Sequence, residues 1–254
     1  MTNIIACRLA SYGKYQDRGW SHLPEIGIRN VEIPAPAGGE LEAIKRRLAD
    51  HGLKATSLQA RCDIGQAEAV EVMRPQLEAC VTLGAGICFV SIKAGDTDRS
   101  LVCDRLRAIG DAARRLGVIL VMETHPDLVT NGDVGRATMA AIHHPNVRIN
   151  FDTANIYFYN EARTAVGELN KLIDYVGAIH LKDTTGGYQE WSFPALGTGV
   201  VDFPEVFRLL NARGFTGPFT IELEGTKGRE RSEAEQLQYV ADSVAYLRGI
   251  GALR

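Results

Sequence analysis

Short apolar segments recur along the chain at intervals of roughly 25 to 40 residues, with amphipathic helical patterns between them. Each is apolar at successive positions, as in parallel strands that helices cover on both faces. They predict eight strands: IIACRL near residue 5, VEI near 32, ATSLQA near 57, ICFVSI near 90, VILVME near 120, VRINFD near 149, GAIHLKD near 180 and FTIELEG near 221.

The segments between these strands carry start and stop signals of helices. ELEAIKRRLADHG and RSLVCDRLRAIGDAARRLG end on Gly52 and Gly117, and a glycine commonly follows the last turn of a helix. Asp202 is the expected N-cap of DFPEVFRLLNARG. Ser232 and Glu235 have the spacing of a capping box at the start of the last helix.

Regular alternation of strand and helix defines the predicted fold class. No linker, low-complexity stretch or run of like charge divides the 254 residues, and 45% hydrophobic residues suffice for one large core. We therefore predict an α/β protein with a single (β/α)₈ TIM barrel spanning residues 1–254. A doubly wound parallel sheet is the alternative architecture.

Composition restricts the partners. A net charge of −3 and the lack of a basic tract disfavour nucleic acid as a ligand. The five cysteines are odd in number and lack CxxC spacing, which favours reduced thiols and a cytoplasmic protein. The first apolar run is too short for a signal peptide, and no run reaches about 18 apolar residues, so no membrane partner is expected.

Polar residues stand at the ends of the last four predicted strands, where the catalytic groups of TIM barrels lie. They are Glu123 in VMETHP, Asp152 in INFDTAN, His180 in AIHLKD and Glu222 in TIELEG. Each could simply be a strand-end residue bonded to backbone or water. Four in successive units should instead meet at one barrel mouth, where three carboxylates would repel one another without a cation. The pattern predicts a divalent metal site.

The ligand types narrow the choice of metal. Two glutamates, an aspartate and an imidazole form an oxygen-rich shell that suits Mn²⁺ best, with Co²⁺, Mg²⁺ and Zn²⁺ as alternatives. The three negative charges exceed the two positive charges of one metal ion. One glutamate is therefore able to act as a proton carrier as well.

The chain resembles the xylose isomerase-like barrels, in particular the sugar-phosphate isomerase/epimerase group that includes the ketose 3-epimerases. The resemblance covers essentially the whole chain and is densest between residues 118 and 224. It identifies the superfamily better than the substrate. The motifs that carry it are ETHPDLV, FDTAN, HLKD, LGTGVVDFPEVF, GFTGPFTIELEG and SVAYLR.

This resemblance implies roles for the four strand-end residues. Glu123, Asp152, His180 and Glu222 would bind one divalent metal, and the two glutamates would exchange protons with the substrate. Asn155 departs from the pattern, because many relatives have a histidine at this place. The departure leaves the substrate preference open. Members of this family commonly form homo-oligomers, so the resemblance also suggests a homo-oligomer.

Seven further residues are candidate substrate contacts: Glu32, Arg61, Lys93, His125, Asn155, Lys182 and Trp191. Strand alternation puts Lys182 on the side of His180, where it contacts substrate or forms a salt bridge. His125 either orients Glu123 or touches substrate. Trp191 suits the apolar face of a sugar, or packs within its loop.

The remaining candidates lie at the ends of other strands. Arg61 and Lys93 follow the third and fourth strands and suit a carboxylate or phosphate, or are solvated loop charges. Glu32 lies near the end of the second strand and could contact a hydroxyl. Asp183 belongs to the same second tier, and Glu224 lies farther out than Glu222, where it could pair with a base.

The hypothesis favoured by these observations is a metal-dependent isomerase or epimerase that acts α to the carbonyl of a sugar or polyhydroxy ketone, through an enediolate. A keto-polyol dehydratase would use the same site. A phosphodiesterase such as an abasic-site endonuclease is disfavoured, because it needs several zinc ions, many histidines and a basic surface. A non-catalytic sugar-binding barrel does not require a metal between two proton carriers.

Overall fold

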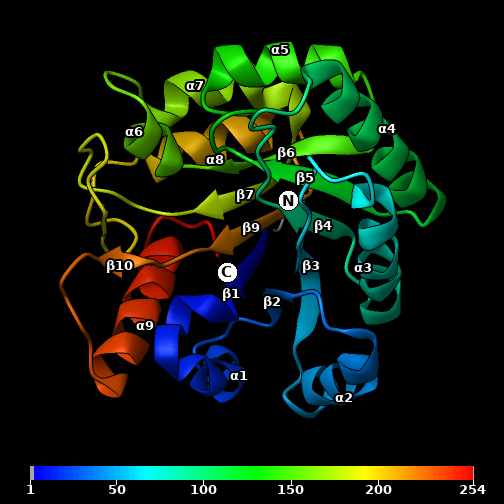
Figure 1. The fold of residues 1–254 in the computed structure, drawn as a ribbon. Helices are drawn as coiled ribbons and strands as arrows, with labels where there is room; N and C mark the ends of the chain where they lie inside the picture. Colours follow the sequence, from blue (N-terminus) through cyan, green and yellow to red (C-terminus); the bar gives the residue numbers. More distant parts are fainter. Residues whose placement is uncertain (1–2, 254) are drawn as a thin grey trace.

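The computed structural model describes residues 3–253 and confirms the predicted TIM barrel (Figure 1). Eight strands pair in parallel around a closed ring, and β1 pairs with the last of them, β9. Each of the eight predicted apolar segments forms one barrel strand. The strands are β1 (Ile4–Arg8), β2 (Asn30–Pro34), β3 (Lys54–Ala60), β4 (Ile87–Val90), β5 (Ile119–Glu123), β6 (Val147–Asp152), β7 (Val176–Leu181) and β9 (Pro218–Ile221).

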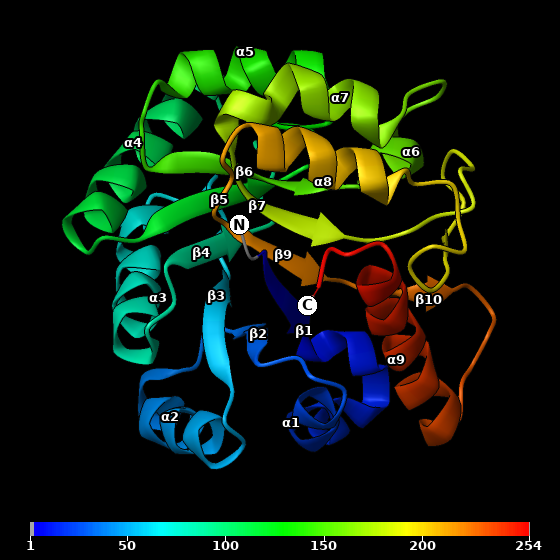
Figure 2. The same cartoon turned by 180° about the vertical axis from the view of Figure 1, so that it is seen from behind.

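Helices surround the barrel, as the view from behind also shows (Figure 2). The α-helices are α1 (Gln16–Glu25), α2 (Leu41–Asp50), α3 (Ala69–Leu83), α4 (Arg99–Arg115), α5 (Gly132–Ile142), α6 (Asn155–Tyr159), α7 (Ala165–Leu172), α8 (Phe203–Ala212) and α9 (Glu233–Gly249). Short 3₁₀ helices are η1 (Leu9–Tyr15), η2 (Gly38–Glu40) and η3 (Ile173–Tyr175). The main hydrophobic core lies between these helices and the strands.

Apolar side chains also fill the interior of the barrel. Ile87, Phe89, Val121 and Ala178 form a separate buried cluster there. They alternate along their strands with residues that face the helices, which explains why the strands are apolar at successive positions. The polar residues at the strand ends lie next to this inner cluster.

Capping residues and a glycine begin or end the helices where the sequence predicts. The Asp202 side chain accepts the backbone N–H of Glu205 at the start of α8. Ser232 and Glu235 form a reciprocal capping box at the start of α9. Gly117 follows α4 with a φ of 69°, a conformation that side chains other than glycine disfavour.

A small antiparallel ribbon lies outside the barrel and has no counterpart in the sequence predictions. It pairs β8 (Ser192–Phe193), in the long loop after β7, with β10 (Gly225–Thr226), in the loop after β9. Two-residue strands are too short to show a periodic pattern. The ribbon joins these two loops beside α9 at the edge of the barrel mouth (Figures 1 and 2).

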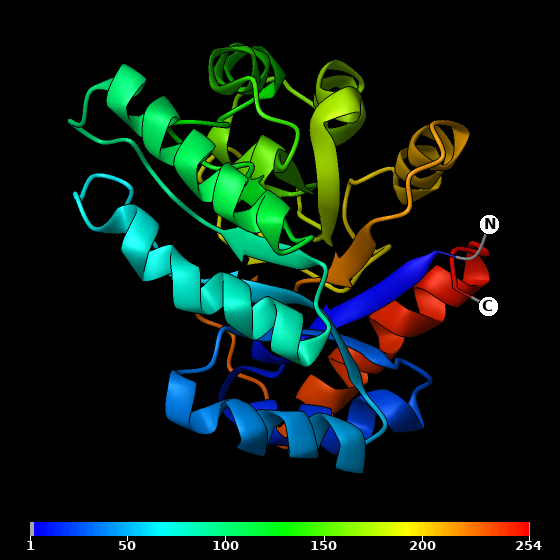
Figure 3. The same ribbon diagram turned by 90° about the vertical axis from the view of Figure 1, so that its right-hand side faces the viewer.

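The beginning and end of the described chain lie side by side, because β1 runs next to the last turns of α9 (Figure 3). The Asn3 side chain donates to the carbonyl oxygen of Ala252 at 3.0 Å. All five cysteines are free thiols, and four of them are buried. Within residues 3–253, no helix is both long and apolar enough to cross a membrane.

Candidate metal centre

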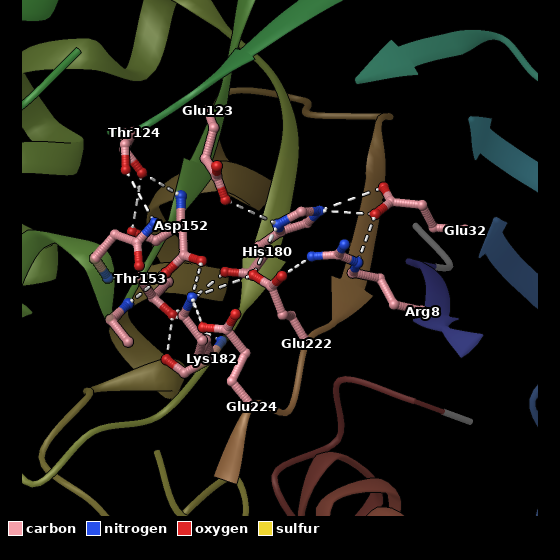
Figure 4. A network of polar contacts seen from close by, with 12 residues as sticks. Arg8, Glu32, Glu123, Thr124, Asp152, Thr153, His180, Lys182, Glu222 and Glu224 are labelled. Carbon is pink, nitrogen blue, oxygen red and sulfur yellow. Dashed lines mark hydrogen bonds and ion pairs between the residues drawn. The ribbon is translucent and has the colours of Figure 1, made fainter. Parts of the chain in front are cut away.

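The four predicted ligands meet at the carboxyl end of the barrel, as Figure 4 shows. Glu123 and Asp152 are the last residues of β5 and β6, His180 is next to last in β7, and Glu222 follows β9. One potential ligand atom from each residue lies within 4.8 Å of the others. Parallel strands place their ends at the same edge, so residues far apart in the sequence converge.

Two buried atoms of this group form no hydrogen bond among residues 3–253: Nδ1 of His180, and Oδ2 of Asp152, which has only an ion pair with Lys182. The other oxygen of Asp152 accepts the backbone N–H groups of Ala154 and Asn155, both at 2.9 Å. His180 Nδ1 lies 3.0 Å from Glu222 Oε2. Neighbouring ligands of an octahedral cation with bonds of about 2.1 Å lie about 3 Å apart. The residues present therefore fit a divalent metal.

Lys182 is buried among the same carboxylates. Its Nζ lies 2.9 Å from Asp152 Oδ2, 3.3 Å from Glu222 Oε2 and 2.8 Å from Glu224 Oε2. Burial alone would lower the pKa of Lys182, but Asp152, Glu224 and Glu123 raise it overall. Lys182 is therefore protonated, and it forms the salt bridges that were one of the two interpretations of its place in the sequence. Glu224 pairs with a base, as expected.

Arg8, the last residue of β1, is a site residue that the sequence reasoning missed. Its guanidinium contacts Glu222 Oε1, lies 3.2 Å from Glu32 Oε1 and donates to Gln59 at 2.9 Å. The signal was present, because Arg8 ends its strand as the four ligands end theirs. The residues predicted from the sequence lie at or near the ends of the second to eighth strands, and none was taken from the first.

Glu32 lies on the far side of His180 from the other carboxylates. The Nε2 atom of His180 lies 3.3 Å from both Glu32 oxygens, and Ser57 Oγ donates to Glu32 at 2.5 Å. Burial alone would raise the pKa of Glu32, but His180, Arg8 and Ser57 lower it to about 2. An ionised Glu32 favours a proton on Nε2 and leaves Nδ1 free to bind a cation.

Glu123 is held less tightly than Glu222. Its Oε1 atom lies 3.9 Å from His180 Nδ1, and its carboxylate forms no hydrogen bond within the described residues. Glu222, in contrast, contacts Arg8 through one oxygen and Lys182 through the other. The two glutamates therefore have different environments.

The charges of the centre do not balance. Two permanent cations, Arg8 and Lys182, face five carboxylates, those of Glu32, Glu123, Asp152, Glu222 and Glu224. With a neutral imidazole, three negative charges remain in excess in a largely buried space. Repulsion among them is relieved by a divalent cation or by protonation.

Three hydroxyl groups fix the backbone at the site, each by accepting an N–H and donating to a carbonyl across a strand end. Thr124 bonds both the N–H and the carbonyl of Asp152, and Thr153 does so for Lys182. Ser11 accepts the N–H of Leu223 and donates to the carbonyl of Ile221, on either side of Glu222. The hydroxyls thereby limit the movement of these residues.

The other residues that were predicted to contact the substrate have different surroundings. The amide of Asn155 donates to the carbonyl of Thr124 at 3.1 Å, so its side chain supports the strand ends. His125 packs edge-on against Tyr159, with ring centroids 4.8 Å apart, and its Nδ1 atom lies 2.7 Å from the carbonyl of Pro126. The backbone N–H of Asn155 bonds Asp152, but within residues 3–253 neither of these two side chains forms a hydrogen bond or ion pair with the four candidate ligands.

Trp191, Arg61 and Lys93 are exposed. Trp191 packs edge-on against Phe158 and Phe193 and also lines a cavity that contains Glu222. Arg61 lines a different cavity, beside the end of β3. Lys93 forms no ion pair within residues 3–253. The structure thus brings Trp191 to the cavity that contains Glu222, but not Arg61 or Lys93.

Sequence relatives include two kinds of enzyme. The chain is 29% identical over 170 residues to L-ribulose-5-phosphate 3-epimerase UlaE of Salmonella typhi, covering 63% of this chain and 58% of that protein. It is 27% identical over 165 residues to inosose dehydratase of Geobacillus thermodenitrificans, covering 58% of this chain and 53% of that protein. The matches thus span less than two thirds of these relatives.

Solved structures share the fold at lower identity. D-allulose 3-epimerase from Methylomonas sp. superposes with a TM-score of 0.77 at 16% identity, covering 98% of this chain and 97% of that one. An L-ribulose 3-epimerase gives a TM-score of 0.76 at 18% identity, with coverage of 99% and 95%. The family described as xylose isomerase-like TIM barrel matches residues 21–249. The chain therefore belongs to the xylose isomerase-like TIM-barrel family.

Proposed function

We propose that the protein is a divalent-metal-dependent isomerase or epimerase, acting α to the carbonyl of a sugar or polyhydroxy ketone. The observation that carries this proposal is the placement of Glu123 and Glu222 around one candidate metal position shared with Asp152 and His180. A site that moves a proton from carbon needs a base and a group that returns the proton. The epimerases among its relatives are consistent with this chemistry.

In this reaction a metal ion and the two glutamates would have separate roles. A bound divalent cation would polarise the substrate carbonyl and acidify the adjacent C–H bond. One of Glu123 and Glu222 removes that proton, which leaves an enediolate on the substrate, and the other returns a proton. Return to the opposite face of the same carbon gives an epimer. Return to the neighbouring carbon gives an aldose–ketose isomer.

Cationic neighbours distinguish the two glutamates. Glu222 is held between Arg8 and Lys182, whereas Glu123 lies at the partly exposed edge of the site. We therefore assign to Glu123 the proton transfer that requires more movement of the side chain. Lys182 also holds Asp152 and Glu224 in place during this transfer.

A keto-polyol dehydratase remains the second candidate, because inosose dehydratase is among the sequence relatives. It would use the same proton removal and then expel a β-hydroxyl group. Product analysis distinguishes the two, because dehydration changes the mass of the product by one water and epimerisation does not.

Replacement of either glutamate by glutamine tests the proposal. Glutamine keeps the size and one oxygen ligand but removes the basic carboxylate, so turnover should fall by about 10² to 10⁴ in Glu123→Gln and Glu222→Gln. Substrates from a ketose panel, incubated with Mn²⁺-loaded wild type in D₂O, should gain deuterium next to the carbonyl. Glu25→Gln, a change at an exposed glutamate of α1, is the matched control.

Metal content must be measured in the same preparations. We expect one divalent metal per wild-type chain by elemental analysis, and much less in His180→Ala. Two or three tightly bound metals would instead favour a phosphodiesterase. If both glutamine variants bind metal and keep near-wild-type turnover, the proton carrier lies elsewhere.

A further inference from the structure

A cavity of about 350 Å³ opens directly beside the candidate metal centre. Arg8, Glu222 and Glu224 belong to its inner wall. Trp191 lines it from the loop after β7, and Arg229 and Arg231 line it from the loop after β9. A substrate whose carbonyl lies at the metal position would extend into this space.

Some of the charged groups in the cavity wall form ion pairs and others do not. Glu222 pairs with Arg8, and Glu224 pairs with Lys182. Within residues 3–253, neither Arg229 nor Arg231 lies at ion-pair distance from a carboxylate. Hydrogen bonds from Ser232 lower the pKa of Glu235, and Arg229 and Arg231 lower it further from a greater distance. Each acidic group of the cavity wall thus has a cationic partner, whereas the two guanidinium groups at the outer end have no carboxylate in direct contact.

Arg231 is held in place by its surroundings. Its guanidinium lies 3.9 Å from the ring centroid of Tyr239 on α9, as a stacked cation does. A Cβ atom at Gly225 would lie 2.9 Å from Arg231 Nη1, so glycine in β10 leaves room for this side chain. The hydroxyl of Tyr239 donates to the carbonyl of Phe193 in β8, which connects the same ring to the ribbon.

The ribbon sets the distance between the aromatic and basic walls. β8 and β10 pair residue for residue, and the N–H of Lys227 donates to the carbonyl of Trp191 at 2.9 Å. Trp191 is 42% exposed, which leaves one surface of the indole available to a ligand. An aromatic ring beside two arginines suits a molecule that has both an apolar face and a negative charge.

We propose that the substrate carries a terminal oxyanion, a phosphate ester or a carboxylate, which Arg229 and Arg231 bind at the outer end of this cavity. The inference rests on the proposed function, since it places the substrate carbonyl at the metal centre. TIM barrels frequently bind phosphate through the loops after their last two strands, which is where these arginines lie. Arg61 and Lys93, the anion-binding candidates of the sequence, do not line this cavity.

The test compares matched substrates that differ in their terminal group. Fructose, fructose 6-phosphate and fructuronate present a hydroxyl, a phosphate and a carboxylate at the same carbon. Deuterium incorporation from D₂O measures kcat/KM for each with wild type and with the double variant Arg229→Ala, Arg231→Ala. Lys227→Ala removes a positive charge from the same loop outside the cavity wall and is the control.

We expect wild type to prefer one of the two anionic substrates over fructose. The double variant should lose about 10- to 100-fold of that preference, as expected for charge-assisted hydrogen bonds, and Lys227→Ala should keep it. The anion that is preferred identifies the substrate as a phosphate or a carboxylate. A wild-type preference for fructose, or a preference that survives in the double variant, would overturn the proposal.

Binding of inorganic phosphate, followed by calorimetry, separates this inference from the proposed function. Phosphate binding that is lost in the double variant and kept in Lys227→Ala supports the oxyanion site even if no ketose exchanges deuterium, in which case the proposed function alone fails. Ketose turnover with no change of preference in the double variant refutes only the oxyanion site.

Discussion

Glu32 shows how a single residue outside the four candidate ligands can position one of them. It is 3% exposed, its oxygens lie 3.3 Å from His180 Nε2, and Arg8 connects it to Glu222. The ring of His180 also packs against Phe89, with centroids 4.6 Å apart. Together these contacts determine the direction in which Nδ1 points, and outer partners of this kind commonly support metal-binding histidines.

Removal of the charge of Glu32 should therefore weaken metal binding. In Glu32→Gln we expect the dissociation constant for Mn²⁺, measured by calorimetry, to rise by about 10- to 100-fold. Glu25→Gln, at an exposed position, should bind like wild type. Unchanged Mn²⁺ affinity in a folded Glu32→Gln protein would mean that Glu32 only packs beside the site.

At the scale of elements, the loop after β7 depends on one buried carboxylate. Asp183 accepts four backbone N–H groups from its own loop, those of Thr184, Gly197, Gly199 and Val201, at 2.8 to 3.2 Å. The same loop carries Trp191 and β8. Asp183, a second-tier candidate in the sequence, thus shapes the wall of the site.

Asp183→Asn should loosen this loop, because an amide NH₂ group would face N–H donors. We expect the free energy of unfolding to fall by about 2 to 3 kcal/mol. Amide hydrogen exchange should accelerate between residues 184 and 201. Asp96→Asn, a change at an exposed loop residue, serves as control. Wild-type exchange rates in Asp183→Asn would show that other contacts maintain the loop.

At the scale of the whole molecule, folding brings like charges together. The excess of carboxylates over Arg8 and Lys182 is created only when distant strands close the barrel. A cation that binds the folded chain better than the unfolded chain must stabilise it.

Metal addition should therefore raise the melting temperature. Mn²⁺ at about 100 times its dissociation constant contributes about 2.7 kcal/mol, which corresponds to a shift of about 5 to 10 °C for a domain of this size. Calorimetry of the chelator-treated protein with and without Mn²⁺ measures the shift. His180→Ala should show a much smaller one. Equal melting temperatures with and without Mn²⁺ in wild type would contradict a metal site in this cluster.

Local patterns in the sequence were sufficient to predict the helices and strands and part of the candidate site. Burial on both faces marks a strand of a parallel sheet, and caps such as Ser232 mark helix starts, because both depend on residues close in the chain. The convergence of Glu123, Asp152, His180 and Glu222 also follows from the sequence, since parallel strands bring their carboxyl ends together.

Tertiary structure alone decided which groups support these four candidate ligands. His180 and Glu32 are 148 positions apart, and Ser11 holds the end of β9 from 212 positions away. Contacts across a closed barrel leave no periodic signal, because the two partners share no stretch of chain. The pairing of β8 with β10 likewise arises only when the barrel closes and brings the two loops to one side of its mouth, where Trp191 and Arg231 line the same cavity.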